Sequence, residues 1–273
     1  MMNTQDIRHD STDPDDGIAP LDWQDQPFSC EGCAHTDLKA KGKCEYARAC
    51  VHDRYARRVD RFFRWNPELG NQYLTHPYFE VRAIGARHAD VFKLPALIED
   101  EDETVRMSIA MRLPQRLLLK MVRDPHREVR IRVAQRLEAD QLKTMTVDPD
   151  YYVRAMVARR LPLSLLSQMA QDEDNKVREE VARRMEMPAL LNLIHDPDSS
   201  IRRIVAQRLP VDLLDRLTDD EDWLVRWEIT QRANPGLLAT MSQDVDPEVR
   251  LAVADRMTQL SNRQHIDSEV HHG

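Results

Sequence analysis

The stretch Asp148-Pro-Asp-Tyr-Tyr-Val-Arg-Ala-Met-Val-Ala-Arg-Arg-Leu-Pro162 decides the fold, because its pattern returns along most of the chain. Its Val-Arg pair recurs at a constant step of 24 residues, without insertion or deletion. The eight copies place this pair at Val81, Val105, Val129, Val153, Val177, Ile201, Val225 and Val249. A fixed period of this length indicates a repeat architecture in which each copy is one supersecondary unit.

Each copy predicts a short amphipathic helix. If the Val or Ile is position 0, then Ile or Val stands at position +4 in seven copies, and Ala stands at +5 in seven copies. Leu or Met usually follows at +8, and these positions share one face of a helix. Asp occupies position −5 in seven copies, and Pro follows it in three. We therefore expect the −5 Asp to be the N-cap and the Pro to be the first helical residue.

A second, shorter helical segment is expected in every repeat. Proline at +9 ends the first helix in three copies, at Pro114, Pro162 and Pro210. Leu then stands at +13 in all seven complete copies, and Leu or Met at +16. A unit of 24 residues has room for one helix of about 12 residues and one short α or 3₁₀ segment. Because one such unit cannot bury both of its sides, we predict an all-α solenoid of eight stacked repeats.

The composition agrees with this fold class, and the arginines allow two interpretations. Only 7 glycines and 5% aromatic residues are present in 273 residues, which favours helices over sheets. Arg stands at +1 in all eight copies and at +7 in seven. These arginines could bind phosphate or nucleic acid, or they could pair with the turn Asp residues of adjacent layers, which recur with the same period. We favour the pairing, and the net charge of −8 argues against nucleic acid as a partner.

All four cysteines fall within 21 residues, at Cys30, Cys33, Cys44 and Cys50. Such clustering is typical of a metal site, with two disulfides as the minor alternative. Four thiolates satisfy either a tetrahedral zinc ion or an iron-sulfur cluster. The spacing of five residues between Cys44 and Cys50 favours the cluster modestly, because zinc sites more often repeat the C-x₂-C pair. His35 is interpreted as a neighbour of the site and not as a ligand.

The cysteine segment, followed by units of the form D-P-D-x-x-V-R-x-x-V-A-x-R-L-P, resembles the leucine-rich repeat variant (LRV) family over about residues 28–257. The resemblance implies an N-terminal [4Fe-4S] domain in which Cys30, Cys33, Cys44 and Cys50 are the cofactor-binding metal ligands. It also implies repeats that alternate α and 3₁₀ helices in a right-handed superhelical solenoid without strands, and an association with nitrogen-fixing bacteria. The first repeat departs from the pattern, with His76, Gly85 and His88 at template positions.

Between the cysteines and the repeats, residues 51–73 interleave arginines with aromatic residues. These residues are Arg54, Tyr55, Arg57, Arg58, Arg61, Phe62, Phe63, Arg64 and Trp65. We interpret the segment as a helix whose aromatic side chains cover the first layer while its arginines stay solvated. The alternative is a basic docking face for an acidic redox partner.

Four regions are predicted along the chain. Residues 1–27 form an acidic, disordered leader, since residues 1–28 hold seven Asp and one Arg. Residues 28–75 form the iron-sulfur domain with its connecting helix, residues 76–258 form the repeat solenoid, and residues 259–273 form a C-terminal tail.

The sequence contains no catalytic signature. No nucleophile constellation, phosphate loop or paired-carboxylate site occurs outside the repeat turns, so we expect the protein not to be an enzyme. No membrane span or secretory signal is visible, which predicts a cytoplasmic location. The expected function is a non-enzymatic iron-sulfur scaffold for a protein partner, such as a redox protein, with a redox or regulatory role linked to nitrogen fixation. The alternatives are a purely structural cluster or zinc ion in a binding module and, third, nucleic-acid binding.

Overall fold

The computed structural model describes residues 17–270, and it describes side chains as far as residue 262. Residues 1–16 of the predicted leader and 271–273 of the predicted tail lie outside the described residues. Within residues 17–270 the chain forms helices and turns, and its β structure is confined to the isolated bridges Leu21–Pro27 and Glu45–Ala49. The predicted all-α repeat solenoid is therefore confirmed. None of the described helices is both long and apolar enough to cross a bilayer.

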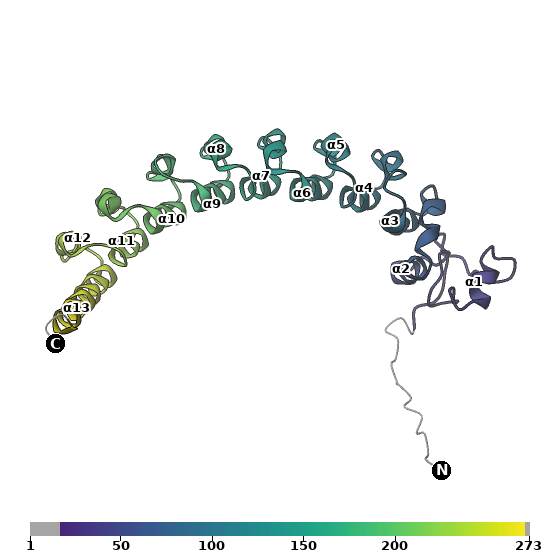
Figure 1. Ribbon diagram of the computed structural model, residues 1–273, viewed down its shortest axis with the longest axis horizontal. Coiled ribbons are helices and arrows are strands. Elements are labelled where there is room, and N and C mark those ends of the chain that lie inside the picture. Colours follow the sequence, from purple (N-terminus) through teal and green to yellow (C-terminus); the bar gives the residue numbers. More distant parts are fainter. Residues whose placement is uncertain (1–16, 271–273) are drawn as a thin grey trace, which may run out of the picture. The chain divides into compact units, whose positions relative to one another are not determined.

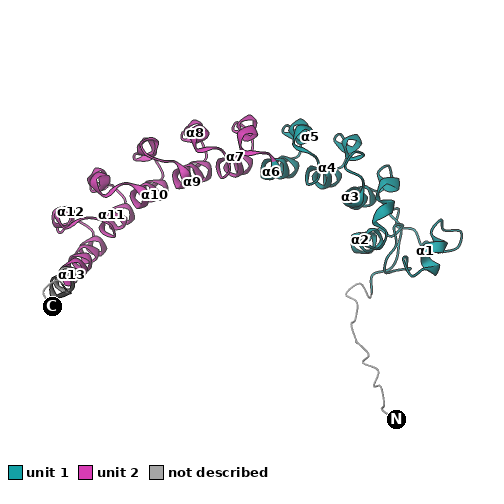
Figure 2. Cartoon of the chain, in the orientation of Figure 1, with its two compact units in different colours: residues 1–136 teal, residues 137–273 magenta. Residues whose placement is uncertain are grey.

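The chain divides into two compact units, residues 1–136 and 137–273 (Figure 2). The α-helices of the first unit are α1 (Thr36–Ala40), α2 (Ala56–Trp65), α3 (Phe79–His88), α4 (Glu103–Ala110), α5 (Gln115–Leu118) and α6 (Arg127–Arg136). Its 3₁₀ segments are η1 (Pro67–Tyr73), η2 (Leu94–Leu97) and η3 (Leu119–Met121).

The second unit continues the same alternation. Its α-helices are α7 (Tyr151–Ala158), α8 (Leu163–Leu166), α9 (Asn175–Arg184), α10 (Ser199–Arg208), α11 (Trp223–Thr230), α12 (Pro235–Thr240) and α13 (Pro247–Val270). Its 3₁₀ segments are η4 (Ala139–Met145), η5 (Ser167–Met169), η6 (Ala189–Leu193) and η7 (Val211–Leu217).

Every complete repeat consists of one main helix and one short second segment, as the periodicity predicts. Within each unit the main helices pack in one row and the short segments form another (Figure 1). The residues at positions 0 and +13 fill the space between them, and both sets are fully or almost fully buried. The +13 leucines are Leu94, Leu118, Leu142, Leu166, Leu190, Leu214 and Leu238. Stacking therefore buries the apolar side of each layer against its neighbours.

The main helices begin two residues later than predicted. The N-cap is the Asp at position −3, as in α10, where the Asp198 carboxylate accepts the Ser200 amide at 2.9 Å. The same cap occurs at Asp102, Asp150, Asp174 and Asp222. The −5 Asp and the Pro that follows it belong to the preceding turn, where Asp196 accepts the amide of Asp198 at 2.9 Å. The N-cap assignment of the −5 Asp was therefore wrong, because that carboxylate has a different partner.

That partner is the +1 arginine of the preceding repeat, 18 residues earlier in the chain. In each pair the guanidinium donates from Nε and Nη2 to the two carboxylate oxygens, while Nη1 donates to backbone oxygens of the turn before its own helix. The pairs are Arg82–Asp100, Arg106–Asp124, Arg154–Asp172, Arg178–Asp196, Arg202–Asp220 and Arg226–Asp244. Each arginine thus joins two consecutive turns, which confirms the predicted pairing for position +1.

The prediction for position +7 was wrong, since the +7 arginines of repeats 2–7 bind carbonyl groups instead of carboxylates. Arg136 Nη1 donates to the Ala110 and Leu113 oxygens at 2.7 and 2.9 Å, at the end of the main helix one repeat earlier. Arg112 and Arg208 repeat the arrangement. The last carbonyls of a helix lack internal partners and carry partial negative charge, so a guanidinium is stabilised there.

The departures of the first repeat from the pattern have steric causes. A Cβ on Gly70 of η1 would lie 2.7 Å from the Ala89 nitrogen and 2.8 Å from the Gly85 oxygen, so two glycines allow η1 to approach α3 closely. His76 stands at the −5 position, where its Nδ1 accepts the Tyr78 amide at 3.1 Å, as Asp196 accepts the amide of Asp198. His88 stacks on Phe63, with ring centroids 6.1 Å apart.

The helix predicted between the cysteines and the repeats is α2 followed by η1. Phe62 and Phe63 are fully buried, as expected, but Arg58 is also buried and bonds Asp53 at 2.9 Å. The expectation that all the arginines stay solvated was wrong for Arg58, because this ion pair compensates its burial.

Two predicted boundaries do not coincide with breaks in the structure. Arg54 N donates to the Leu21 oxygen at 2.8 Å, and Arg58 Nη2 donates to the Ile18 oxygen at 2.7 Å. Residues 18–21 of the predicted leader therefore contact the start of α2. At the other end, α13 passes residue 258 without a break in the helix.

Candidate metal centre

The first two cysteines lie on a turn that leads into α1. The Cys33 amide donates to the Cys30 oxygen at 3.4 Å, and Gly32 between them has a φ of 68°. This left-handed conformation favours glycine, which explains the residue before Cys33. The His35 amide donates to the Cys33 sulfur at 3.4 Å.

The other two cysteines flank a small antiparallel bridge. Glu45 and Ala49 exchange backbone hydrogen bonds of 2.9 and 2.8 Å, and Ala47 at the tip has a φ of 60°. The C-x₅-C spacing therefore places Cys44 and Cys50 side by side across the bridge. Both are buried, whereas Cys30 and Cys33 are partly exposed, and all four are free thiols.

The four predicted ligands line one pocket. Its walls are Phe28, Ser29, Cys30, Cys33, His35, Thr36, Lys39, Cys44, Tyr46, Cys50 and His52. Among the described residues, no three or more His, Cys, Asp or Glu side chains are gathered closely enough to hold a single ion. The donor set suits a sulfur-bound metal group in its chemistry, since it combines four thiols with backbone amides and a lysine that face them.

The two buried thiols, Cys44 and Cys50, share a hydrogen bond. This hydrogen bond lowers the pKa of Cys44 and, together with burial, raises the pKa of Cys50. Lys39 also lowers the pKa of Cys44. Because a metal is bound by thiolates, binding by both cysteines releases the proton that this pair retains.

His35 and His52 line the pocket beside the cysteines, and Tyr73 contacts His35. His35 Nε2 and the Tyr73 hydroxyl are hydrogen-bonded, and the ring centroids of His35 and Phe62 lie 5.3 Å apart. Burial lowers the pKa of His35 and of His52 and raises the pKa of Tyr73 to about 12. His35 thus lies beside the site, as expected. Sequence reasoning missed Tyr73, which lies 38 residues from His35 and carries no local signal.

The cysteine pocket shares its core with the first repeat. Cys44 and Val51 belong to one buried cluster with Phe62, Val81 and Ile84. Val81 and Ile84 lie on α3, the main helix of repeat 1. The site is therefore packed directly against the beginning of the stack.

The comparisons with known proteins agree with both parts of the chain. Residues 20–72 match a family model described as "LRV protein FeS4 cluster", and residues 151–174 match the model "Leucine rich repeat variant". A solved structure titled "A leucine-rich repeat variant with a novel repetitive protein structural motif" is 43% identical, with a TM-score of 0.80. The match covers 84% of this chain and 98% of that one. The chain belongs to the leucine-rich repeat variant family.

A curated relative of this LRV chain comes from Rhodobacter capsulatus. It is named "Uncharacterized 27.7 kDa protein in nifB 3'region" and is 48% identical over 99 residues. The match covers 36% of this chain and 40% of the relative. Together with the family model over residues 20–72, the pocket identifies the N-terminal part as an iron-sulfur cluster domain.

Proposed function

We propose that this LRV protein is a non-enzymatic scaffold whose four cysteines hold a [4Fe-4S] cluster with a redox or regulatory role. The observation that carries the proposal is the apolar core in which Cys44 packs together with Val81 and Ile84 of the first repeat. Through this core, a change at the metal group alters the packing of the first layer. The repeats then offer the surface on which a protein partner is bound.

The [4Fe-4S] assignment rests on the arrangement of the thiols. Cys30, Cys33, Cys44 and Cys50 are distributed around the wall of one pocket. A four-iron cluster takes one thiolate at each iron, whereas zinc draws four sulfurs to about 2.3 Å from one point. Amide hydrogen bonds to the Cys33 and Cys50 sulfurs and the charge of Lys39 offset the negative charge of such a cluster.

Metal analysis tests this assignment. Anaerobic purification is expected to yield brown protein with about four iron and four sulfide per chain. Cys50→Ser is expected to lose the absorption, while Ser29→Ala, on the same pocket wall, retains it. Zinc at one per chain without sulfide contradicts the assignment.

The runner-up is a purely structural cluster that stabilises the start of the stack. It is favoured by the same shared core, because a metal group held by Cys44 would be tied to the apolar residues that Cys44 shares with the first repeat. The two functions differ in their response to reduction. Hydrogen exchange of residues 56–89 is expected to differ between the oxidised and reduced holoproteins if the cluster regulates the scaffold. Equal exchange in both states, with a change upon cluster loss alone, favours the structural role.

The setting of the function is also a proposal. The name of the Rhodobacter relative supports a link to nitrogen fixation, and the clustered free thiols fit a reducing, cytoplasmic location. The partner is a protein, with a redox protein as one candidate. Nucleic acid is disfavoured, because the +1 and +7 arginines described above are engaged within the stack.

A further inference from the structure

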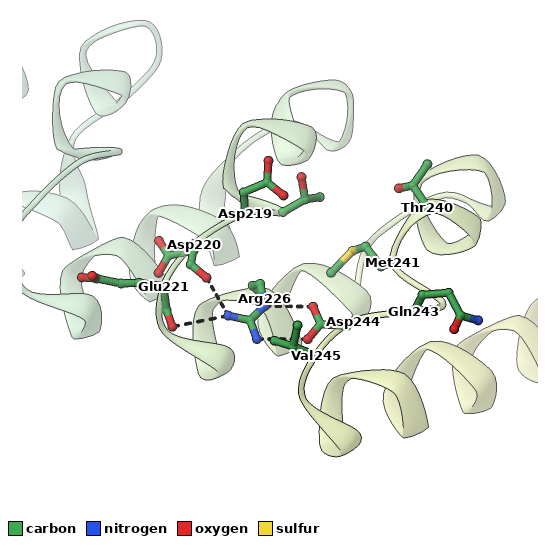
Figure 3. Close-up of a pocket in the computed structure, with 10 residues that line it drawn as sticks. Asp219, Asp220, Glu221, Arg226, Thr240, Met241, Gln243, Asp244 and Val245 are labelled. Atoms are coloured by element: carbon green, nitrogen blue, oxygen red, sulfur yellow. Dashed lines mark hydrogen bonds and ion pairs between the residues drawn. The ribbon is translucent and has the colours of Figure 1, made fainter.

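Arg226 illustrates how an interior layer is joined to the next one. Its Nη1 donates to the backbone oxygen of Asp220 at 2.6 Å, in the turn before its own helix. Its Nε and Nη2 donate to the two carboxylate oxygens of Asp244 at 2.8 and 3.0 Å, in the turn that follows (Figure 3). The side chain is only 8% exposed. Each nitrogen of the guanidinium thus donates to one of the two turns.

Arg250 makes only the first half of this arrangement. Its Nη1 donates to the backbone oxygens of Asp244 and Val245 at 2.6 and 3.1 Å. The residue 18 positions further on is Ser268 in place of an Asp, and α13 continues as a helix where a turn would follow. Among the residues whose side chains are described, no carboxylate meets Nε and Nη2, and Arg250 is exposed. A planar guanidinium fork is left facing solvent in the geometry that binds a carboxylate elsewhere in the chain.

The apolar side of the same layer is also uncovered. Leu251 is 57% exposed and Met257 is 39% exposed, and Ala254 between them is exposed as well. At the positions of interior layers that correspond to Ala254 and Met257, Ala206 and Leu209 are fully buried. Arg250, Ala254 and Met257 follow the i, i+4, i+7 spacing, so they share one face of α13 with Leu251 at its edge. We name these four residues the end face.

We propose that the end face binds an acidic amphipathic helical segment of a partner protein, which takes the place of a further layer. A carboxylate of the partner enters the fork of Arg250, and its apolar side chains cover Leu251, Ala254 and Met257. The proposal deepens the scaffold function and rests on it. The interior pairs named above define the required chemistry: a carboxylate in a turn, followed by an apolar helical face.

A second copy of this chain is a poorer match. In the interior pairs, an arginine fork is received by the −5 Asp, in the turn before the main helix of the following layer. In the first layer of this chain that position is His76, and α2 and η1 pack against α3. The chain therefore does not present an open first layer to the end face of another copy.

A peptide that copies an interior layer tests the binding directly. The probe is residues 219–242 as a labelled peptide, which contains Asp220 ahead of the apolar helix, and the receptor is the full-length holoprotein. We expect saturable binding in fluorescence anisotropy. Asp220→Asn in the peptide, or Arg250→Gln or Leu251→Glu in the chain, should weaken it at least about tenfold. Arg203→Gln, at the exposed position of repeat 6 that corresponds to Leu251, is the matched control and should leave binding unchanged.

A covalent version separates the fit of the end face from the cost of ordering a free peptide. In this variant residues 259–273 are replaced by a copy of residues 235–258, which continues the period by one layer. We expect the extended chain to have a higher melting temperature than the parent. Arg250→Gln should lower the melting temperature more in the extended chain than in the parent.

Three results overturn the proposal. They are an extended chain no more stable than the parent, no saturable binding of the peptide, and a dimer of the parent chain that Leu251→Glu dissociates. Cluster absorption is recorded on the same samples. Lost peptide binding with an intact cluster contradicts the end face alone, whereas a missing cluster contradicts the proposed function and leaves the peptide result standing.

Discussion

Arg178 and Asp196 form a buried bidentate ion pair, with Nε and Nη2 of the arginine 2.8 and 3.0 Å from the two carboxylate oxygens. The arginine belongs to α9 and the aspartate to the turn before α10, so the pair joins two layers of the second unit. Nη1 of Arg178 meanwhile donates to the Asp172 oxygen at 2.8 Å, one turn earlier. One side chain therefore bridges the edges of two layers.

We expect Asp196→Asn to destabilise the protein by about 3 kcal/mol, because it leaves a buried guanidinium without its counter-charge. The measurement is the free energy of unfolding in urea, followed by circular dichroism. Arg183→Gln, which breaks the exposed pair of Arg183 with Glu179, is the control and should cost less than about 1 kcal/mol. Equal costs for the two substitutions would contradict the role assigned to the +1 arginines.

The +7 arginines give a second prediction. Arg112 Nη1 donates to the Ala86 and Ala89 oxygens, both at 2.6 Å, at the end of α3. Replacement by Met keeps most of the apolar stem but leaves these carbonyls without a donor, so we expect a loss of about 1.5 to 3 kcal/mol. Arg112→Lys retains the charge at the helix end and should lose less. Thermal unfolding of the parent and of the two Arg112 variants measures their order of stability. A Met variant as stable as the Lys variant would be incompatible with binding of Arg112 at the helix end.

Much of this fold could be predicted from the sequence, because each layer repeats the same buried residues and the same ion pair. The 24-residue period, the buried leucines at +13 and the pairing of Arg178 with Asp196 all follow from residues that recur in step. The roles of the two turn aspartates were not readable in the same way. Asp196 and Asp198 are both plausible N-caps by residue type, and only the position of an arginine one layer earlier distinguishes them.

The candidate site was readable to a smaller extent. Clustering alone indicated the four cysteines, and the structure brings all of them to one pocket. Tyr73 and the buried Arg58 could not be found in this way, since their partners depend on how η1 and α2 fold back against the cysteine segment. The exposed fork of Arg250 likewise becomes visible only when its environment is compared with that of Arg226.

Acid is expected to remove the contribution of Asp244 to stability. Burial raises the pKa of this carboxyl, but the hydrogen bond from Arg226 and the amide of Asp246 outweigh burial, and the pKa lies below its ordinary value. A carboxyl whose pKa is lowered by folding contributes fully above its unfolded pKa of about 3.9, and the contribution disappears as the pH falls through the folded value. The difference in unfolding free energy between the parent and Asp244→Asn should therefore be largest at pH 6 and should shrink below about pH 4. A difference that is constant from about pH 6 to pH 2 would refute the lowered pKa.

The close approach of η1 to α3 leads to the last prediction. A Cβ at Gly70 would lie 2.7 Å from the Ala89 nitrogen and 2.9 Å from the His88 carbonyl carbon, and both of these are backbone atoms that a rotamer change cannot move. Gly70→Ala must therefore push η1 away from α3 and open the core that includes Phe63 and Val81, at a cost of about 1 to 3 kcal/mol. Gly236→Ala is the matched control, because its Cβ would meet only the Asn234 side-chain oxygen at 3.4 Å and α12 would gain helix propensity. Since Cys44 belongs to the same core, the Gly70 variant should also lose its cluster absorption faster in air than the Gly236 variant does. Equal stability and equal rates of cluster loss would mean that η1 and α3 separate without disturbing the cysteine pocket, and the coupling between the metal centre and the first layer would then have to be abandoned.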